Sequence, residues 1–365
     1  MKPLQIAVVG AGHLGRIHAK LLAQVDDAEL VAIVDPIATA REHARTLYPV
    51  DTFAAIEEVI DSIDAAVVAS PSDCHADTVA TLLSAGKHVF VEKPITVRAR
   101  DAERLVQLAD ARRRVLQVGH VERFNPAWTA AAEITSGAKY IEAVRASRFP
   151  GRCLDVGVVM DLMIHDIDLV LSLTSAAVSD VRASGLAVVS DHEDLAEARI
   201  EFECGLVANL KASRISPSPA RQMTTFGPNG FADIDFGGLS LDAVRPSPAI
   251  GERSFELGGV TDDPLRFADE LFATYLPSDR ATVEPRNAIL DELHDFVISI
   301  RSRATPTVSG VDGARAVTVA EMVLDQIAAR RWSADATDNL VGPHAIPSEG
   351  IEAASRRLNT ARRAA

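Results

Sequence analysis

The feature that most constrains the fold is a glycine-rich turn near the N-terminus. Gly10-Ala-Gly12-His-Leu-Gly15 directly follows the apolar run Leu4–Val9 and opens an amphipathic stretch. In this context Gly10 permits a tight turn, Gly12 lets the backbone approach a pyrophosphate, and Gly15 lets helix and strand pack closely. The free N–H groups at the helix start would face phosphate oxygens. The turn therefore predicts a strand–turn–helix unit that binds a dinucleotide, although such a turn can also be purely structural.

An acidic residue at the end of the second apolar run supports the dinucleotide prediction. Asp35 follows the run Glu29–Val34 and lies 20 residues after Gly15. A carboxylate at this place accepts hydrogen bonds from ribose hydroxyls and repels a 2′-phosphate. Pro36 comes next, and no Arg or Lys stands beside Asp35 in the sequence. The pattern therefore favours NAD over NADP as cofactor.

Short apolar runs alternate with helical patterns through residues 4–118, as in a doubly wound parallel sheet. The expected strands are Leu4–Val9, Glu29–Val34, Ala65–Ala69, His88–Val91 and Val115–Val118. Apolar residues recur at helical spacing in residues 53–60, 76–83 and 102–109, and Gly86 stands where a helix C-terminus favours glycine. We expect an N-terminal Rossmann domain over residues 1–122.

A different pattern begins near residue 139, where strand-like runs follow one another with Gly, Pro and Asp turns between them. The runs are Lys139–Ser147, Val181–Ser190, Ala196–Glu203, Leu206–Ser213, Gln222–Phe226 and Phe231–Phe236. They predict an open, mainly antiparallel sheet in a second domain, residues 123–332, interrupted by one helix at 157–173. Helices at 286–303 and 311–332 are expected to pack back onto the assembly, and residues 333–365 to form a loosely held tail.

Composition limits the partners and the compartment. The chain has 37 basic and 51 acidic residues, a formal charge of −14, which argues against nucleic acids and anionic membranes as main partners. No apolar run approaches the ~18 residues that a membrane span needs. Cys74, Cys153 and Cys204 are scattered without metal-like spacing. They look like reduced thiols, so we expect a cytoplasmic protein.

Two further strand ends carry polar residues. Ser70 and Pro71 follow the third expected strand and are predicted to line the cofactor, because the carboxyl ends of parallel strands form the ligand-binding edge. His75 can contact the cofactor, but a structural role at a helix N-terminus is an equal alternative. His120 follows the fifth strand and is a further candidate at this edge.

The tripeptide Glu92-Lys93-Pro94 brings a cation to the same edge, at the end of the fourth expected strand. A lysine there can donate to a reacting hydroxyl oxygen and stabilise a developing alkoxide. Pro94 allows a cis Lys–Pro bond, which would fix the direction of the lysine. The alternative is an exposed Glu–Lys pair before a proline that starts a helix.

The expected helix at 157–173 is apolar nearly all round, except for one polar stripe. Asp161, His165, Asp168 and Ser172 share this stripe at i, i+4, i+7 and i+11. Three explanations remain open: a satisfied polar network, an acid/base site in which a carboxylate orients His165, and a metal site. No other Cys or His cluster supports a metal, so none is expected.

The motifs together resemble the glucose–fructose oxidoreductase/inositol dehydrogenase family, the Gfo/Idh/MocA group. The resemblance rests on Gly10–Gly15, Glu92-Lys93-Pro94, Asp161-Leu-Met-Ile-His165-Asp-Ile-Asp168 and Val308-Ser-Gly-Val-Asp-Gly313, and it runs from residue 4 to about 332. It implies NAD(P)-dependent oxidation or reduction at a sugar or polyol carbon. It also implies a homodimer or homotetramer formed through the open face of the second sheet.

Carried over by motif, the resemblance makes Lys93, Asp161 and His165 the catalytic residues. His165 would be the general base, Lys93 would polarise the hydroxyl oxygen, and Asp161 would orient the sugar. The residues expected to contact the cofactor are Gly10, Gly12, His13, Leu14, Gly15, Asp35, Ser70, Pro71, His75, Glu92 and Lys93.

A branch of the family is indicated by Gly119-His120-Val-Glu122-Arg123-Phe-Asn125-Pro126 together with Asp155–Leu171. These segments are similar to UDP-N-acetylglucosamine 3-dehydrogenases, which oxidise the C3 hydroxyl of the sugar. Family members often have a Gly–Gly pair before the catalytic Asp, whereas this chain has Asp155-Val-Gly157-Val-Val, which puts the common substrates in doubt. The residues expected at the substrate are His120, Arg123, Asn125, Arg148, Asp161 and His165.

Arginines are candidates for the diphosphate of a nucleotide sugar, because guanidinium matches phosphate oxygens. Arg123, Arg148 and Arg152 are those nearest the motifs, and plain solvent exposure is the alternative for each. The leading hypothesis is oxidation at C3 of a UDP-N-acetylhexosamine. An inositol 2-dehydrogenase or other polyol dehydrogenase is the first alternative, and an NAD-binding regulator without turnover is the second.

Overall fold

The computed structural model describes residues 2–149, 156–254 and 264–329, and these form two compact units. Unit 1 comprises residues up to 126 together with 285–321, and unit 2 comprises 127–284 together with the residues from 322 onward. The expected tail at 333–365 lies outside the described residues, as do Arg152, Cys153 and Asp155. Within the described parts, no helix is both long and apolar enough to cross a membrane.

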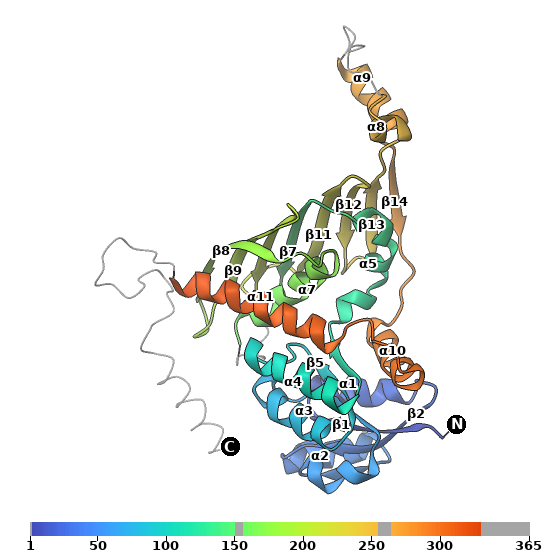
Figure 1. Cartoon of the computed structure of the whole chain (residues 1–365), viewed down its shortest axis with the longest axis vertical. Helices are drawn as coiled ribbons and strands as arrows, with labels where there is room; N and C mark the ends of the chain where they lie inside the picture. The colour runs from blue at the N-terminus through green and yellow to red at the C-terminus, as the bar shows by residue number, and fades with distance from the viewer. Residues whose placement is uncertain (1, 150–155, 255–263, 330–365) are drawn as a thin grey trace, which may run out of the picture. The chain divides into compact units, whose positions relative to one another are not determined.

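Unit 1 contains the predicted Rossmann sheet, six parallel strands in the order β3-β2-β1-β4-β5-β6 (Figure 1). The strands are β1 (Leu4–Val9), β2 (Ala28–Val34), β3 (Asp51–Phe53), β4 (Ala65–Val68), β5 (His88–Glu92) and β6 (Leu116–Gly119). The helices of the unit are α1 (His13–Leu22), α2 (Ala38–Leu47), α3 (His75–Ser84), α4 (Ala99–Arg112), α10 (Ala288–Ser302) and the first part of α11 (Gly310–Ala329). All five strands expected in this region are confirmed within one or two residues.

Helices cover both faces of this sheet, which is why its strands are apolar on both sides. On one face α1 and α10 pack together over Ile6, Val8 and Phe90, all fully buried. On the other, α3 and α4 pack against each other, and α3 contacts β4 and β5. Gly86 follows α3 with φ +74°, as expected for a glycine after a helix C-terminus.

The helical pattern expected at residues 53–60 is wrong. Phe53 belongs to β3, which pairs with β2, and only two 3₁₀ turns follow, η1 (Ile56–Glu58) and η2 (Ile60–Ser62). The Glu58 carboxylate accepts hydrogen bonds from the backbone N–H groups of Ala54 and Ala55, each at 2.9 Å. These bonds close a tight turn, and Ile56 and Val59 are buried by it just as a helix would have buried them.

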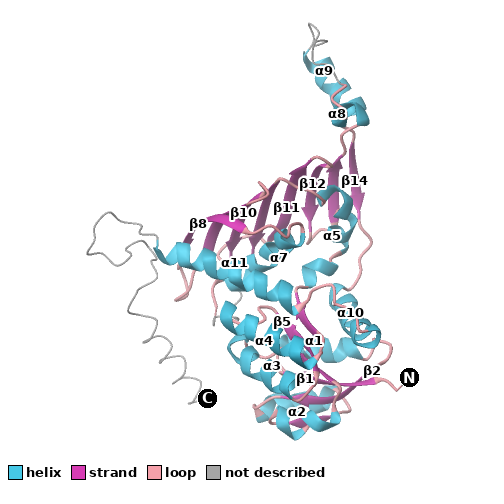
Figure 2. Ribbon diagram, viewed as in Figure 1, coloured by secondary structure: helices cyan, strands magenta, loops and turns pink. Residues whose placement is uncertain are grey.

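Unit 2 is built on the expected open sheet, eight strands in the order β14-β13-β12-β11-β7-β10-β9-β8 (Figure 2). The strands are β7 (Tyr140–Ala146), β8 (Val178–Leu186), β9 (Leu195–Phe202), β10 (Val207–Ser213), β11 (Ala220–Gly227), β12 (Gly230–Asp235), β13 (Ser240–Val244) and β14 (Ser278–Thr282). Every neighbouring pair is antiparallel except β7–β10. Only β13 and β14 were not expected from the sequence.

Helical segments of unit 2 pack on one face of the sheet or extend from its edge. They are α5 (Pro126–Ala130), α6 (Ala132–Thr135), the π-helical turn η5 (Val159–Met163), α7 (Ile164–Ser172), α8 (Pro248–Gly251), α9 (Pro264–Glu270) and the π-helical turn η7 (Leu271–Tyr275). Strands β7 and β9 alternate buried and exposed residues, so only one face of the sheet is packed.

Strand β8 ends earlier than the predicted Ser190. The carboxylate of Asp194 accepts hydrogen bonds from the N–H groups of Val188, Val189 and Ser190 at 2.6–3.0 Å. Those N–H groups therefore point at one side chain instead of at a neighbouring strand, and the chain leaves the sheet at Leu186.

Candidate functional site

The glycine-rich turn of unit 1 has the geometry that its three glycines predict. Gly10 has φ +101°, and a Cβ there would lie 2.6 Å from the carbonyl oxygen of Ala69. A Cβ at Gly15 would overlap the carbonyl oxygen of Gly10, whereas a Cβ at Gly12 would meet no atom within 4 Å. The first and third glycines are thus required by packing. Open space at Gly12 is what close approach of a pyrophosphate needs.

Helix α1 begins directly after this turn with its first N–H groups uncapped. Gly12 is the N-cap residue, and no side chain of the described residues caps the helix. His13 and Leu14 are exposed at this end, Leu14 to 38%. An uncapped helix N-terminus on a glycine turn fits the phosphates of a dinucleotide.

Asp35 couples the end of β2 to the turn. Its Oδ2 accepts a hydrogen bond from the N–H of Ala11 at 2.8 Å, and its Oδ1 accepts one from the N–H of Ile37 at 2.8 Å. Each carboxylate oxygen keeps a second lone pair, so a ribose hydroxyl can still donate to it. No arginine directly follows or precedes Asp35 in the sequence, but the fold brings Arg41 next to it. Arg41 Nη1 donates to the carbonyl oxygens of Asp35 and Pro36 at 2.7 and 2.9 Å.

At the end of β4, Ser70 offers a polar atom that nothing in the described chain satisfies. Its Oγ is buried and has no hydrogen-bond partner among the described residues. His75 is buried at the start of α3, with Nδ1 2.8 Å from the carbonyl oxygen of Pro94 and Nε2 2.9 Å from that of Ser70. This geometry favours the structural alternative for His75, which joins the ends of β4 and β5. Cofactor contact by His75 stays a prediction.

The Glu92-Lys93-Pro94 segment ends β5 as expected, and the Lys93–Pro94 peptide bond is cis. Lys93 is half-buried, and its N–H donates to Glu92 Oε2 at 3.3 Å. Glu92 itself is 8% exposed, and its Oε1 lies 2.7 Å from Nε2 of His18. No role for His18 was predicted from the sequence. The signal was its position on the buried face of α1, between Gly15 and Leu22.

The helix of unit 2 that holds Asp161 and His165 begins with a π-helical turn, Val159–Met163, and continues as α7. Asp161 lies inside the π turn, and turns of this type are frequent at functional sites. The predicted polar stripe divides in the structure: Asp161 and His165 are half-buried, whereas Asp168 is 1% exposed. Ser172 donates to the carbonyl oxygen of Leu169. An acid/base role is therefore open to the first two residues.

Two buried residues hold the start of this helix, and neither was expected from the sequence. Glu193 Oε1 accepts a hydrogen bond from the N–H of Val159 at 3.1 Å, and Nη1 of Arg214 donates to the carbonyl oxygen of Val156 at 3.0 Å. Burial raises the pKa of Glu193, and its hydrogen bonds only partly offset that. No spacing in the sequence links either residue to the helix, because the contacts come from the β8–β9 connection and from the end of β10.

Gly157 is required by the same arrangement, because a Cβ there would overlap the Glu193 carboxylate. We expect Gly157→Ala to destabilise unit 2 by about 1–3 kcal/mol, the usual cost of overpacking a filled interior. In a Glu193→Ala background the same change should cost much less, since the overlap is gone. Gly251→Ala is the matched control because a Cβ there meets no atom within 4 Å. Equal costs in both backgrounds, measured by urea unfolding, would contradict this account.

A buried ion pair anchors α7 to the sheet. Arg145 of β7 donates to Asp166 through Nε at 3.2 Å and through Nη2 at 2.8 Å. Both side chains are at most 5% exposed. Asp166 neighbours His165 in the chain, so this pair fixes the part of the helix from which His165 projects. The sequence placed Asp166 off the polar stripe and therefore missed it.

The other residues expected at the substrate differ in their surroundings. In unit 1, His120 is fully buried, Arg123 is half-buried, and the side-chain amide of Asn125 donates to Glu122 Oε2 at 2.9 Å. In unit 2, Arg148 is exposed, and its Nε donates to the carbonyl oxygen of Pro217 at 2.8 Å.

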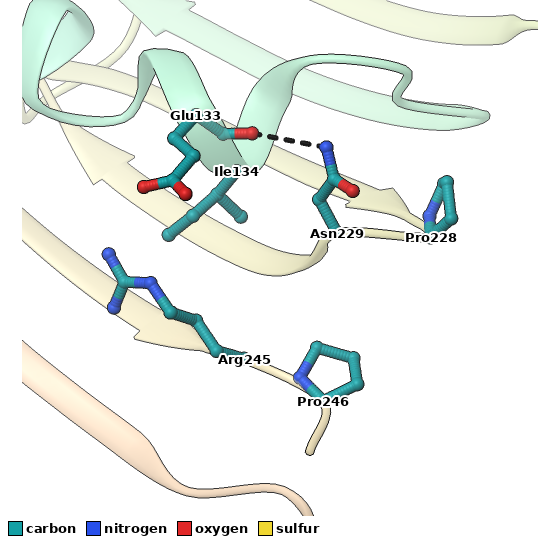
Figure 3. Close-up of a pocket in the computed structure, with 6 residues that line it drawn as sticks. All are labelled: Glu133, Ile134, Pro228, Asn229, Arg245 and Pro246. Carbon is teal, nitrogen blue, oxygen red and sulfur yellow. Dashed lines mark hydrogen bonds between the residues drawn. The ribbon is translucent and has the colours of Figure 1, made fainter. Parts of the chain in front are cut away.

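One cavity belongs to unit 2 and is lined by none of these residues. It has a volume of about 300 Å³ and is formed by α6, the β11–β12 turn and the end of β13 (Figure 3). Its lining residues are Glu133, Ile134, Pro228, Asn229, Arg245 and Pro246. Asn229 closes one wall by donating to the carbonyl oxygens of Glu133 and Ser136. None of the residues expected to bind substrate lines this cavity.

Comparison with known proteins agrees with the two-unit description. Residues 4–120 match the model of an oxidoreductase family with an NAD-binding Rossmann fold, and residues 133–233 match the GFO/IDH/MocA C-terminal domain. The chain is 32% identical to the UDP-N-acetylglucosamine 3-dehydrogenase of Acidithiobacillus ferrooxidans over 88% of this chain and 96% of that protein. It is 28% identical to the inositol 2-dehydrogenase of Rhizobium meliloti over 90% and 98% of the two chains.

Solved structures show the same architecture. A crystal structure of the Acidithiobacillus ferrooxidans enzyme superposes with a TM-score of 0.77 at 31% identity, over 90% of this chain and 98% of that one. The scyllo-inositol dehydrogenase of Lactobacillus casei, solved with NAD(H) and scyllo-inositol, gives a TM-score of 0.70 at 22% identity over 90% and 97%, which supports the fold. The glycine turn, the uncapped α1 and the two family matches agree, and the chain belongs to the Gfo/Idh/MocA oxidoreductase family.

Proposed function

We propose that this protein oxidises the C3 hydroxyl group of a UDP-N-acetylhexosamine, with NAD as the hydride acceptor. The observation that carries the proposal is the match, along nearly the whole length of both chains, to an enzyme named for this reaction. Two inositol dehydrogenases that match over 85–90% of this chain do so at 28% identity. A polyol is therefore the second candidate substrate.

The proposed chemistry needs a base, a cation and an orienting carboxylate. His165 takes the proton of the hydroxyl group as the C–H bond breaks, and Lys93 donates to the oxygen and stabilises its negative charge. Asp161 orients the sugar. It lies in the π-helical turn that leads into α7, the helix that carries His165. Bound NAD supplies the hydride acceptor. Half-burial of Lys93, Asp161 and His165 supports these roles, because each side chain is held by the protein yet open to a ligand.

Cofactor binding is proposed for the residues at the strand ends of unit 1. The turn Gly10–Gly15 and the start of α1 would hold the pyrophosphate, Asp35 the adenosine ribose, and Ser70 and Pro71 the edge beyond β4. Substrate binding is proposed for His120, Arg123, Asn125 and Arg148, with the two arginines at the diphosphate. A cytoplasmic location belongs to the same proposal and is supported by the exposed thiol of Cys204, which forms no disulfide.

A homodimer or homotetramer through the sheet of unit 2 also forms part of the proposal. Val144 of β7 and Phe226 of β11 point to the same face of the sheet, opposite the buried Ile141 and Arg145. They are 37% and 43% exposed, so this face of the sheet offers apolar side chains to a second copy of the chain. Sedimentation of the wild-type protein tests this part of the proposal.

The function is tested by following NADH absorbance with purified protein and NAD. UDP-N-acetylglucosamine is expected to support turnover, and its kcat/KM should exceed that of myo-inositol by at least about tenfold, or ~1.4 kcal/mol. Turnover with myo-inositol but not with the nucleotide sugar would favour the polyol alternative. NAD binding without turnover on a broad panel of sugars and polyols would favour a non-catalytic regulator.

The preference for NAD is expected to depend on the Asp35 carboxylate. Asp35→Ser removes the charge that repels a 2′-phosphate and leaves Arg41 beside the site, so kcat/KM for NADP relative to NAD should rise at least about tenfold. The double change Asp35→Ser/Arg41→Met is the control, because it removes the guanidinium that would bind the phosphate. A ratio unchanged by Asp35→Ser would show that other residues select the cofactor.

A further inference from the structure

Three titratable side chains lie buried together in unit 1, next to Lys93, and the proposed chemistry does not use them. His18 of α1 is 0% exposed, Glu92 of β5 8%, and Glu292 of α10 1%. One side-chain N or O atom from each lies within 4.8 Å of the others. Burying charged groups is costly unless they are paired, so a cluster of this kind in a protein core needs an explanation.

The contacts link the cluster to Lys93. His18 Nε2 lies 2.7 Å from Glu92 Oε1, and the other carboxylate oxygen, Oε2, accepts the N–H of Lys93 at 3.3 Å. Phe90 packs edge-on against the ring of His18, and Phe296 packs against Phe90, so one side of the cluster is apolar. Because these rings exclude water from that side, the local dielectric is low and the charges of the cluster act more strongly on neighbouring groups.

The two carboxyl groups respond to this setting in opposite directions. Burial raises the pKa of Glu292 well above its usual range, and the charges of Glu92 and Asp295 raise it further. Burial also opposes ionisation of Glu92, but the hydrogen bond and charge of His18, with Lys93 and His75 behind it, lower the pKa of Glu92 below its usual value. The opposite directions of these shifts favour the negative charge on Glu92 and the proton on Glu292.

We propose that His18, Glu92 and Glu292 are positioning residues, a buried array that keeps one carboxyl group ionised and the other protonated beside Lys93 and so holds the lysine for catalysis. The inference rests on the proposed role of Lys93. His18 fixes the orientation of the Glu92 carboxylate, and Glu292 carries the proton that prevents a second buried charge. The Oε2 atom of Glu292 has no hydrogen-bond partner among the described residues, which fits a neutral carboxyl group better than an ionised one.

A divalent cation is the competing explanation for two buried carboxyl groups beside a histidine. The direct hydrogen-bond distance between His18 and Glu92 favours the proton, because a shared metal ion would separate the two ligand atoms. Metal analysis of the purified protein distinguishes them. Stoichiometric zinc in the wild type that is lost in Glu292→Gln would overturn the proposal.

The first test reads the charge of the array without activity. Infrared difference spectra in H₂O and D₂O should show the carbonyl band of a buried neutral carboxyl group at pH 7, and Glu292→Gln should remove it. Glu103→Gln, on the exposed face of α4, is the matched control and should leave the band in place. A band that is absent from the wild type, or that survives in Glu292→Gln, overturns the proposal whether or not a substrate is found.

The second test reads the effect on Lys93. Glu92→Gln should change the rate at which an acetylating reagent labels Lys93 by at least about threefold, measured by peptide mass spectrometry, with Lys20 as the internal control. This readout also needs no turnover, so failure of the proposed function would not hide it. An unchanged rate at Lys93 overturns the positioning role.

Kinetics give the third test on any substrate that the protein turns over. Glu92→Gln should lower kcat about 10–100-fold with little change in the KM for NAD, as expected when a residue supporting a reactive group is lost. Glu292→Gln alone replaces one neutral side chain by another of similar size, so it should lower kcat less than Glu92→Gln does. In the Glu92→Gln background it should cost about a further fivefold, because Glu292 is then the only source of the negative charge. If the two changes lower log kcat additively, the proposal that the two carboxyl groups share one negative charge is wrong.

Discussion

Replacing Lys93 by methionine is expected to lower kcat by about 10²–10⁴-fold, the range typical for loss of a group that assists proton transfer. Methionine keeps most of the length of the side chain and removes only the ammonium group. Lys93 stands at the end of β5, and its backbone N–H donates to Glu92 Oε2. Its position should therefore survive the change, and the loss should appear in kcat.

NAD affinity should change less than about threefold in Lys93→Met, because the glycine turn and Asp35 are expected to supply most of the binding. Lys20→Met is the control: Lys20 is an exposed lysine on α1 of the same unit and should leave kcat unchanged. Stopped-flow measurement of the NADH produced separates binding from chemistry. Turnover of Lys93→Met within twofold of the wild type would remove Lys93 from the reaction.

The Rossmann unit could be predicted from the sequence because its signals are local. The glycines of the turn each meet a steric demand within a few residues, and buried parallel strands are continuous apolar runs bounded by turns. The strand ends then order the site, since Asp35, Ser70 and Lys93 each follow a strand of one parallel sheet. The helix predicted at 53–60 is wrong, because a 3₁₀ turn buries Ile56 and Val59 as well as a helix does and leaves the same apolar pattern in the sequence.

Long-range polar contacts could not be predicted in the same way. Glu193 and Arg214 hold the start of the Asp161 helix from 30 or more residues away, and no periodicity relates them to it. Asp194 ends β8 through three backbone N–H groups, where hydrophobic pattern alone extended the strand to Ser190. The sequence shows His18 only as a histidine on the apolar face of a helix. A structural core histidine with its hydrogen bonds satisfied gives the same pattern, so the contact with Glu92 could not be predicted.

Replacing Arg214 by methionine is expected to destabilise unit 2 by about 3–5 kcal/mol, because it leaves Asp194 as a buried charge without its cation. Arg214 Nε lies 2.7 Å from Asp194 Oδ1, and the two side chains are 1% and 0% exposed. The same guanidinium donates to Ser190 Oγ and to the carbonyl oxygen of Val156. Loss of Arg214 therefore also loosens the segment that leads to Asp161, and kcat should fall with stability.

Arg182→Met is the matched control, since Arg182 pairs with Asp180 at 3.0 Å in solvent, with side chains 79% and 46% exposed. A pair of this kind contributes about 0–1 kcal/mol. Urea unfolding in a Trp332→Phe background makes Trp128, which stacks on Phe236 in unit 2, the reporting tryptophan. Equal destabilisation by the buried and the exposed change would contradict the assignment.

The difference in unfolding free energy between the wild type and Arg214→Met is also expected to depend on pH. Burial opposes ionisation of Asp194, but the N–H groups of Ser190 and Val189 and the Arg214 guanidinium hold its pKa far below the usual range. A lowered carboxyl pKa stabilises the folded state above the unfolded value of about 3.9, and this stabilisation is lost as pH falls toward the folded value.

Without Arg214 the pKa of Asp194 is lowered less, so the variant has less of this stabilisation to lose. The gap in unfolding free energy between wild type and Arg214→Met should therefore be constant from pH 7 to about 5 and should narrow below about pH 4. A gap that persists at low pH would place the effect in the lost contact between the guanidinium and the Phe149 ring instead of in the attraction to Asp194.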